Sequence, residues 1–371
     1  MDHHALRRER LARRLPDEGL DALVVTSTVN VTYLTGFTGD SSVLVVGRDR
    51  VLIVSDPRYV GELADDCPDV PTHIRPPAQK LPEAVAEVLV KLGYRNVGFE
   101  SGAVTVAEFE FLRGLAPAVE WKGAADRVEK LRAVKDEIEI NQIRAAIRVA
   151  DRAFTVLRSL LRPDDREKDL CDALDHYIRR AGGEGVAFPP IVLVGERSAR
   201  PHARPSDRAV AGGDVLLVDW GAQVHGYKCD LTRVLDARTT ASFTRAPAAR
   251  LEEIHAVVAR AQQAAIAAIR PGAAGRDVDA AARSVIAAAG YGDYFGHGLG
   301  HGFGLQIHEA PAVRPDSTAV LEAGMVCTVE PGIYLPEWGG VRLEDDVLVT
   351  PDGCEVLTHT PRNLESTKAF G

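Results

Sequence analysis

The stretch Gly213-Asp214-Val215-Leu216-Leu217-Val218-Asp219-Trp220-Gly221 is repeated in design later in the chain. Its counterpart is Gly324-Met325-Val326-Cys327-Thr328-Val329-Glu330-Pro331-Gly332. In both, a glycine precedes five mostly apolar residues, an acid, one further residue and a second glycine. Short apolar runs between glycines are typical of buried β-strands. The repeat therefore predicts a pseudo-symmetric domain of two similar halves, each built around such a strand.

Each of these strands is followed by a loop and by a second strand that also carries an acid, Asp230 in the first half and Glu344 in the second. The pattern predicts two hairpins, which turn near residues 224–225 and 337–338. In each hairpin the acid of one strand is expected to face the acid of the other. Directly opposite side chains in an antiparallel pair lie about 5 Å apart at Cβ.

Four acids on apolar strands need compensation if they are buried together, because like charges raise one another's pKa and each buried ion costs several kcal/mol. Two divalent cations would balance them, and an oxygen-rich site with one imidazole suits Mn²⁺, Co²⁺ or Zn²⁺. Two metal ions about 3.5 to 4 Å apart activate a shared water and polarise a carbonyl, which points to hydrolysis of an amide or ester. The alternative is that some of the acids lie at exposed strand ends.

Residues 295–309, Phe-Gly-His-Gly-Leu-Gly-His-Gly-Phe-Gly-Leu-Gln-Ile-His-Glu, contain three histidines and five glycines. Glycine costs a helix interior about 1 kcal/mol each, so an extended chain or loop is expected. In an extended chain side chains alternate, which puts His297 and His301 on one face and His308 on the other. At most one or two of the three are expected to bind a metal ion, with His301 as the single nitrogen donor. The alternative is a flexible loop with incidental histidines.

The first part of the chain alternates short apolar runs with helical patterns, which predicts a small α/β domain of residues 1–125. Five arginines near its start are interleaved with acids, so their helix is expected to present a solvated face. These arginines are Arg7, Arg8, Arg10, Arg13 and Arg14. Strands are expected at residues 22–25, 43–46, 51–54 and 97–99, a hairpin turn at 47–50, and helices at 81–92 and 104–112.

A second domain is expected over residues 126–371, with the boundary near residues 123–134. An apolar stripe at alternating steps of three and four predicts a long helix over residues 140–161, which Pro163 ends. Further helices are expected at residues 168–180, 249–269 and 278–288.

The composition excludes several classes of protein. The chain has 371 residues, and 44 basic against 53 acidic residues give a net charge of -9, which argues against a nucleic-acid partner or an acidic membrane surface. No apolar run approaches the roughly 18 residues of a membrane span, and no signal-peptide pattern follows Met1, so a cytoplasmic location is expected. The five cysteines are odd in number and far apart, which predicts reduced thiols.

Several motifs resemble those of the Xaa-Pro aminopeptidase and prolidase family, over nearly the whole chain. Pro201-His202-Ala203 resembles the family's upstream Pro-His motif, and residues 30–37, Asn-Val-Thr-Tyr-Leu-Thr-Gly-Phe, resemble the signature of its N-terminal domain. The five metal motifs are matched by Asp219-Trp-Gly-Ala, Asp230-Leu-Thr-Arg, Gly-His301-Gly-Phe-Gly-Leu-Gln-Ile-His308-Glu, Val-Glu330-Pro-Gly-Ile-Tyr and Val-Arg342-Leu-Glu344-Asp.

This resemblance implies a creatinase-like N-terminal domain followed by a "pita-bread" domain, two pseudo-symmetric halves around a dinuclear metal centre. It implies a peptidase that cleaves the Xaa-Pro bond of proline-containing peptides, with two divalent ions per subunit, Mn²⁺ foremost. It also implies a homodimer in which one subunit's small domain shapes its neighbour's pocket. The implied metal ligands are Asp219, Asp230, His301, Glu330 and Glu344.

The same resemblance implies roles for further residues. Glu330 also becomes the carboxylate that handles the protons of the bridging water. His202, His297 and His308 face the substrate, with His308 as a donor near the scissile carbonyl. Arg342 orients a ligand or contacts the substrate, and a purely structural ion pair is an equal alternative.

Two departures from the family's pattern leave the substrate preference open. Trp220 stands where another aromatic residue is more common, and Cys229 where a serine is more usual. Strand alternation points Cys229 away from the metal face, so the site is expected to be retained. Three alternatives stay open: methionine aminopeptidase activity, creatinase-like C–N hydrolysis, and a non-catalytic binding module on the same fold. The choice between dipeptidase and aminopeptidase is open as well.

Overall fold

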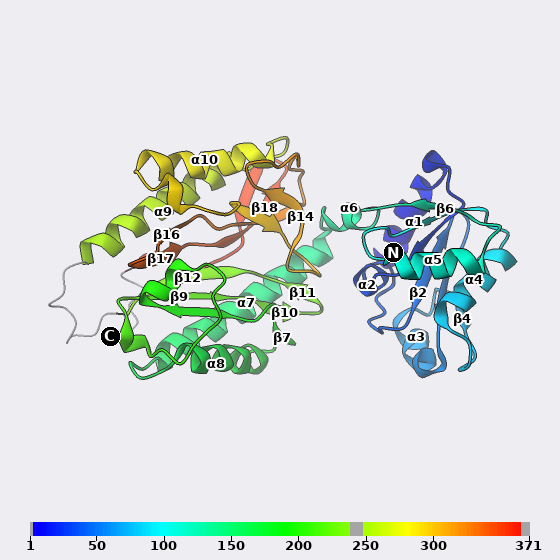
Figure 1. Cartoon of the computed structure of the whole chain (residues 1–371), viewed down its shortest axis with the longest axis horizontal. Helices are drawn as coiled ribbons and strands as arrows, with labels where there is room; N and C mark the ends of the chain where they lie inside the picture. Colours follow the sequence, from blue (N-terminus) through cyan, green and yellow to red (C-terminus); the bar gives the residue numbers. More distant parts are fainter. Residues whose placement is uncertain (1–2, 238–247, 365–371) are drawn as a thin grey trace. The chain divides into compact units, whose positions relative to one another are not determined.

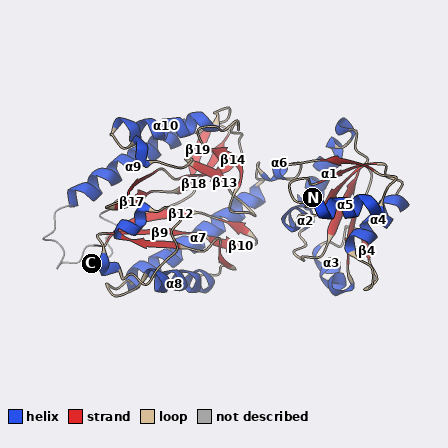
Figure 2. Ribbon diagram, in the orientation of Figure 1, coloured by secondary structure: helices blue, strands red, loops and turns tan. Residues whose placement is uncertain are grey.

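The computed structural model of the chain describes residues 3–237 and 248–364. The chain divides into two compact units, Met1–Arg132 and Ala133–Gly371 (Figure 1). Both units combine helices with β-strands (Figure 2), which confirms the predicted α/β class. The assignment of residues 1–125 and 126–371 as domains stays a prediction.

The first unit is built on a six-stranded sheet in the order β4-β3-β2-β1-β5-β6. The two edge strands are short, polar and partly exposed, so their sequence lacks the apolar pattern that reveals a strand; they are β4 (Thr72–Ile74) and β6 (Glu120–Gly123). The four predicted strands are present as β1 (Ala22–Val25), β2 (Val43–Gly47), β3 (Val51–Ser55) and β5 (Asn96–Phe99).

Helices accompany this sheet, and both predicted ones are present. The second of these begins with a capping box, in which Thr105 Oγ1 accepts from Glu108 N and Glu108 Oε2 accepts from Thr105 N. The helices of the unit are α1 (His3–Arg14), α2 (Thr28–Thr35), α3 (Val60–Asp66), α4 (Leu81–Lys91), α5 (Val106–Leu115) and the short α6 (Glu129–Arg132).

The prediction that α1 presents all its arginines to solvent is wrong for two of them. Arg7 and Arg8 are buried, with 3% and 6% of their surface exposed. The Arg7 guanidinium lies 4.1 Å from the centre of the Tyr33 ring and donates to Tyr33 O. Arg8 donates to Leu34 O at 2.8 Å. Both contacts come from α2, so charge spacing along α1 alone cannot reveal them.

The second unit contains the predicted long helix, α7 (Glu137–Leu160). It starts before the apolar stripe because Asp136 and Glu139 form a reciprocal capping box, with N–H to carboxylate distances of 2.9 and 3.0 Å. The other predicted helices are α8 (Glu167–Arg180), α9 (Ala248–Ala268) and α10 (Gly275–Ala288).

Two sheets carry the repeated strands of the sequence, which confirms the pseudo-symmetric halves. One has the order β12-β9-β8 and packs with α7 and α8 around one hydrophobic core. The other has the order β14-β13-β15-β18-β19 and packs with α9 and α10 around a second core. Their strands are β8 (Ile191–Val194), β9 (Val215–Trp220), β12 (Leu231–Asp236), β13 (Gly300–Gly302), β14 (Glu309–Val313), β15 (Val326–Val329), β18 (Asp345–Thr350) and β19 (Gly353–Val356).

Both hairpins turn where the sequence predicts. In the first, His225 and Gly226 both have positive φ, 47° and 78°, as in the two-residue turns whose twist matches that of the flanking strands. In the second, Leu335 pairs with Gly339 across residues 336–338. The strands next to the turns are β10 (Ala222–Val224), β11 (Tyr227–Lys228), β16 (Gly332–Leu335) and β17 (Gly339–Arg342), and β7 (Gly185–Val186) pairs with β10.

The two halves meet at Thr232 of β12 and Glu344, which form an isolated antiparallel bridge. Glu344 N donates to Thr232 O at 3.2 Å, and Thr232 Oγ1 donates to Glu344 Oε2 at 2.6 Å. This bridge joins β12, an edge strand of the first half's sheet, to the residue that precedes β18.

Two further findings concern the chain as a whole. No helix among residues 3–237 and 248–364 is long and apolar enough to cross a membrane. All five cysteines are free thiols, as predicted.

Candidate metal centre

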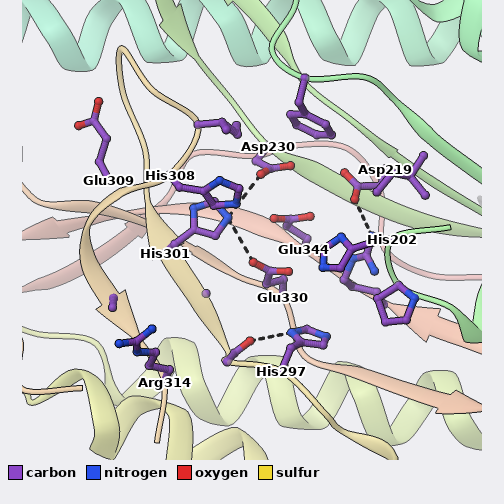
Figure 3. A pocket seen from close by; sticks show the side chains of 18 residues that line it. His202, Asp219, Asp230, His297, His301, His308, Glu309, Arg314, Glu330 and Glu344 are labelled. Carbon is purple, nitrogen blue, oxygen red and sulfur yellow. Dashed lines mark hydrogen bonds and ion pairs between the residues drawn. The ribbon is translucent and has the colours of Figure 1, made fainter. Parts of the chain in front are cut away.

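A cavity of about 520 Å³ in the second unit is the candidate site (Figure 3). Phe188 and Ile191 form part of its apolar wall. Every residue that the sequence analysis names for metal or substrate lines this cavity: His202, Asp219, Asp230, His297, His301, His308, Glu330, Arg342 and Glu344.

The second hairpin brings two of the acids together. Val329 of β15 pairs with Asp345 of β18, and the same register places Glu330 opposite Glu344 at the next position. This arrangement agrees with the predicted facing pair.

In the first hairpin the predicted register is wrong by two residues. Asp219 of β9 pairs with Thr232 of β12, and Asp230 precedes Thr232 by two positions. Residues two apart on a strand share a face, so Asp230 is a diagonal neighbour of Asp219. The hydroxyl of Thr232 occupies the position directly opposite.

His301 lies among the acids. Its Nε2 atom is 3.7 Å from Asp230 Oδ2 and 3.5 Å from Glu330 Oε1. One ligand atom each of Asp230, His301 and Glu344 lie within 4.8 Å of one another. Figure 3 shows these side chains pointing toward a common centre.

Burial raises the pKa of all four carboxyl groups. The pKa values of Asp230 and Glu344 lie well above the usual range because of burial and then the nearest carboxylates, Glu344 beside Asp230 and Glu330 beside Glu344. Burial raises the pKa of Glu330 to about 7. Burial also raises the pKa of Asp219, although the Arg342 guanidinium opposes that shift. The cluster is thus short of positive charge.

The residues fit divalent cations. Asp219 Oδ1 is buried and receives no hydrogen bond from the described part of the chain. Carboxylates that repel one another at close range, with an unsatisfied oxygen and a nearby imidazole, form the donor set that hard and borderline metal ions prefer.

His301 presents a neutral nitrogen to this cluster. Its Nδ1 atom lies 3.1 Å from Gly302 O, which leaves Nε2 directed at the acids. Burial, and then the neighbouring His308, lower the pKa of His301 to about 4. Neutral imidazole is the form that binds metal ions.

The predicted alternation of the three histidines is wrong at His308. The rings of His301 and His308 lie 4.3 Å apart, and both line the cavity. Only Gly300–Gly302 forms a strand here, and the chain bends through residues 304–308 before β14 begins. The alternation of an extended chain therefore does not reach His308.

His297 is oriented by a tyrosine that the sequence analysis does not single out. Its Nδ1 atom lies 2.7 Å from Gly298 O, and its Nε2 atom lies 2.8 Å from Tyr334 Oη. Burial raises the pKa of Tyr334 to about 12, so its hydroxyl stays protonated. Tyr334 lies in the Val-Glu-Pro-Gly-Ile-Tyr motif, where its position four residues after Glu330 was the available signal.

Arg342 connects the two halves of the site. Its Nη2 atom donates to Asp219 Oδ2 at 2.5 Å, Nη1 donates to Tyr334 Oη at 3.0 Å, and Nε donates to Thr232 Oγ1 at 2.9 Å. A second threonine, Thr328, donates to Glu330 Oε1 at 3.1 Å and accepts from His301 N at 3.1 Å. Neither threonine is identifiable from sequence spacing alone.

Comparison with known proteins places this geometry in a family. Residues 141–351 match the model of metallopeptidase family M24, and residues 7–134 match the creatinase/prolidase N-terminal domain. An Xaa-Pro dipeptidase of Pyrococcus furiosus is 34% identical over 360 residues, which cover 96% of this chain and 99% of that protein.

Solved structures of similar proteins lead to the same family. An Xaa-Pro dipeptidase from Bacillus anthracis superposes with a TM-score of 0.92 at 35% identity, covering 98% of this chain and 99% of that one. An X-Pro aminopeptidase from Thermotoga maritima superposes with a TM-score of 0.86 at 33% identity, covering 95% and 99%. These matches confirm the resemblance seen in the motifs: the chain belongs to metallopeptidase family M24 and carries the creatinase/prolidase type of N-terminal domain.

Proposed function

We propose that this chain is a dinuclear metal-dependent peptidase that hydrolyses the bond between a residue and a following proline, at the N-terminus of peptides or in Xaa-Pro dipeptides. The observation that carries the proposal is the convergence of four carboxylates, three of them buried and Glu330 half-buried, and one neutral imidazole in a single cavity. The relatives named for Xaa-Pro cleavage support the choice of bond.

The five residues Asp219, Asp230, His301, Glu330 and Glu344 would hold two divalent ions. An oxygen-rich set with one nitrogen favours Mn²⁺, with Co²⁺ and Zn²⁺ as the alternatives. When bound, the ions polarise the scissile carbonyl and lower the pKa of the attacking water.

The side chains around the ligands would then act on substrate and protons. Glu330 accepts the proton of the attacking water and returns it to the leaving nitrogen. His308 donates a hydrogen bond to the scissile carbonyl oxygen as negative charge develops there. His202 and His297 bind the substrate, and the apolar wall at Phe188 and Ile191 suits the proline ring.

Arg342 would act through Asp219. Its three donated hydrogen bonds hold the Asp219 carboxylate, the Tyr334 hydroxyl and the Thr232 hydroxyl in one arrangement. Replacement by lysine would leave a single point of attachment, because only the guanidinium presents donors in a fixed plane.

The proposal extends to the organisation of the whole protein. Residues 1–125 form a creatinase-like N-terminal domain, and residues 126–371 form the pita-bread catalytic domain. The protein works as a cytoplasmic homodimer in which one subunit's small domain shapes its neighbour's pocket. Light scattering at working concentration tests the dimer, and a monomeric mass would overturn that part.

One experiment tests the activity and its specificity together. Cleavage of an Xaa-Pro dipeptide is compared with that of an Xaa-Pro-Xaa tripeptide, each with added Mn²⁺, Co²⁺ or Zn²⁺. The Glu330→Ala variant is expected to be folded and inactive with both peptides. Full cleavage by metal-free enzyme, or no cleavage of either peptide with any metal, would contradict the proposal.

A further inference from the structure

Two buried carboxylates outside the candidate ligand set lie on corresponding helices of the two halves. Glu167 is the first residue of α8, and Asp279 lies in α10; their exposed fractions are 0% and 1%. Neither lines the cavity. Burial of a carboxylate is costly unless the charge is fully hydrogen-bonded, so the donors around each one are informative.

Glu167 accepts hydrogen bonds from both ends of the segment that carries His202. Its Oε1 atom accepts from Val194 N at 2.8 Å, and its Oε2 atom accepts from Ser206 N at 2.7 Å and from Ser206 Oγ at 2.6 Å. Arg197 Nε donates to both oxygens, at 3.0 and 2.9 Å. One side chain thus ties together both ends of residues 194–206, and His202 lies within that segment at the cavity wall.

Asp279, together with Arg283, holds the segment that carries His297 by hydrogen bonds to its backbone. Its Oδ1 atom accepts from Leu299 N at 3.0 Å. Both of its oxygens accept from Arg283, whose Nε and Nη2 atoms lie at 2.8 and 2.9 Å. Arg283 in turn donates to Phe295 O at 2.9 Å and to His297 O at 2.8 Å. Asp279 and Arg283 together fix the backbone on both sides of His297.

The two arrangements follow from the pseudo-symmetry. Each helix is preceded by an Arg-Pro pair, Arg162-Pro163 and Arg270-Pro271. Glu167 lies four residues after its proline and Asp279 eight residues after its own, a difference of four residues, or about one helical turn on the same face. Equivalent faces of equivalent helices therefore each supply a carboxylate to the chain that presents a histidine; the arginine that pairs with Asp279 lies on α10 itself, whereas the one that pairs with Glu167, Arg197, lies in the segment with His202.

We propose that Glu167 and Asp279 are matched positioning residues, which fix His202 and His297 for contact with the substrate. The inference rests on the proposed function, in which these histidines bind the peptide. The two carboxylates act through backbone amides, and none of the residues that hydrogen-bond to them above is a proposed metal ligand.

Replacing each carboxylate by the amide of the same shape tests the positioning role of Glu167 and Asp279. Each oxygen of Glu167 accepts a different backbone amide, so Glu167→Gln deprives one end of residues 194–206 of its acceptor whichever way the new amide turns. In Asp279→Asn either the Leu299 amide or an Arg283 nitrogen loses its acceptor. The control is Glu100→Gln in the first unit, where a carboxylate of 4% exposure accepts from Thr26 N and Ser27 N.

Hydrogen exchange read by mass spectrometry on the metal-loaded protein is the first measurement. Exchange is expected to accelerate in peptides spanning residues 194–206 for Glu167→Gln and residues 295–299 for Asp279→Asn, and in neither peptide for Glu100→Gln. Unchanged exchange in those peptides would overturn the proposal. This measurement does not depend on peptidase activity, so it separates failure of the inference from failure of the proposed function.

Kinetics are the second measurement. Both variants are expected to lose about 10- to 100-fold in kcat/KM for an Xaa-Pro dipeptide, chiefly through a higher KM, because displaced histidines bind the substrate poorly. Mn²⁺ affinity measured by calorimetry should stay at the wild-type value. Wild-type KM together with accelerated exchange would overturn the positioning role, as would a loss of Mn²⁺ affinity that accounts for the kinetic defect.

Milder variants keep the test decisive if an amide isostere fails to fold. Ser206→Ala removes one donor to Glu167, and Arg283→Lys loosens the contacts to Asp279 without leaving the carboxylate bare. Both are expected to raise KM in the same direction by a smaller factor. A wild-type KM in both would overturn the proposal.

Discussion

Substitution of Thr232 tests how much the hydrogen bonds between the two halves of the second unit contribute to stability. Its side chain is fully buried, and its hydroxyl donates to Glu344 Oε2 at 2.6 Å and accepts from Arg342 Nε at 2.9 Å. Thr232→Val keeps the branched shape and removes only the hydroxyl. Arg342 would then hold a buried N–H without its acceptor, and Glu344 would lose a donor.

The size of the effect follows from these two contacts. A buried donor left unsatisfied costs about 1–3 kcal/mol, and a hydrogen bond to a charged group contributes about 1.5–3 kcal/mol. Because the two contributions share one hydroxyl and are not fully additive, the free energy of unfolding should fall by about 2–4 kcal/mol. Affinity for Mn²⁺ should fall by about 10- to 100-fold, as for other groups that orient metal ligands.

Urea unfolding of the metal-free protein, followed by far-UV circular dichroism, measures the loss. Thr35→Val is a matched control in the first unit: Thr35 is buried, donates to Val31 O at 2.7 Å and accepts from Phe37 N at 3.1 Å. Its partners are uncharged, so about 1 kcal/mol is expected there. If Thr232→Val proves no more destabilising than Thr35→Val, the charged network does not depend on the hydroxyl and the reasoning is refuted.

Three further outcomes are expected. Addition of Mn²⁺ at about a hundred times its Kd should stabilise the chelated protein by about 2.7 kcal/mol in a thermal melt, whereas no shift would argue against a preformed site. Gly340→Ala should destabilise the second unit in the same assay by about 1–3 kcal/mol, because the new Cβ would lie 2.1 Å from Ser198 O. Burial lowers the pKa of His255 below its usual 6.5, so stability should be lost as pH falls through that value, and melts of His255→Gln should show a shallower loss.

Local patterns account for the parts of the fold that are predictable from the sequence. The strands β1, β2, β3 and β5 are apolar runs between turn residues, and the four long predicted helices carry apolar stripes or follow a proline. Both hairpin turns are also local, because a short segment with residues that tolerate positive φ determines each reversal. Such features need no knowledge of distant residues.

What the sequence patterns do not predict depends on contacts between distant residues. The buried state of Arg7 is set by Tyr33, on a different helix. Whether Asp230 or Thr232 lies directly opposite Asp219 depends on the register of β9 and β12. Both residues point to the same face of the strand, so a repeat in the sequence does not specify which of them is the partner. His308 reaches the cavity through an irregular bend that has no fixed period.

The same distinction applies to the polar residues around the ligands. Thr232 has no distinctive spacing relative to Glu344, which it orients from the other half. Tyr334 lies close to Glu330 in the sequence, but the histidine that it orients, His297, is far from it along the chain. Recognisable motifs identify the groups that carry the chemistry, whereas the groups that orient them become visible only in the folded chain.

The origin of the carboxylates in both halves has a consequence for biosynthesis. Asp219 and Asp230 leave the ribosome well before Glu330 and Glu344, and folding of a growing chain proceeds from its N-terminal part. The earlier half alone offers two of the acids without the imidazole of His301, so a growing chain should retain metal ions weakly. Tight metal retention would then begin only when the second half has docked, and a metal-loaded chain would be one whose two halves are already assembled.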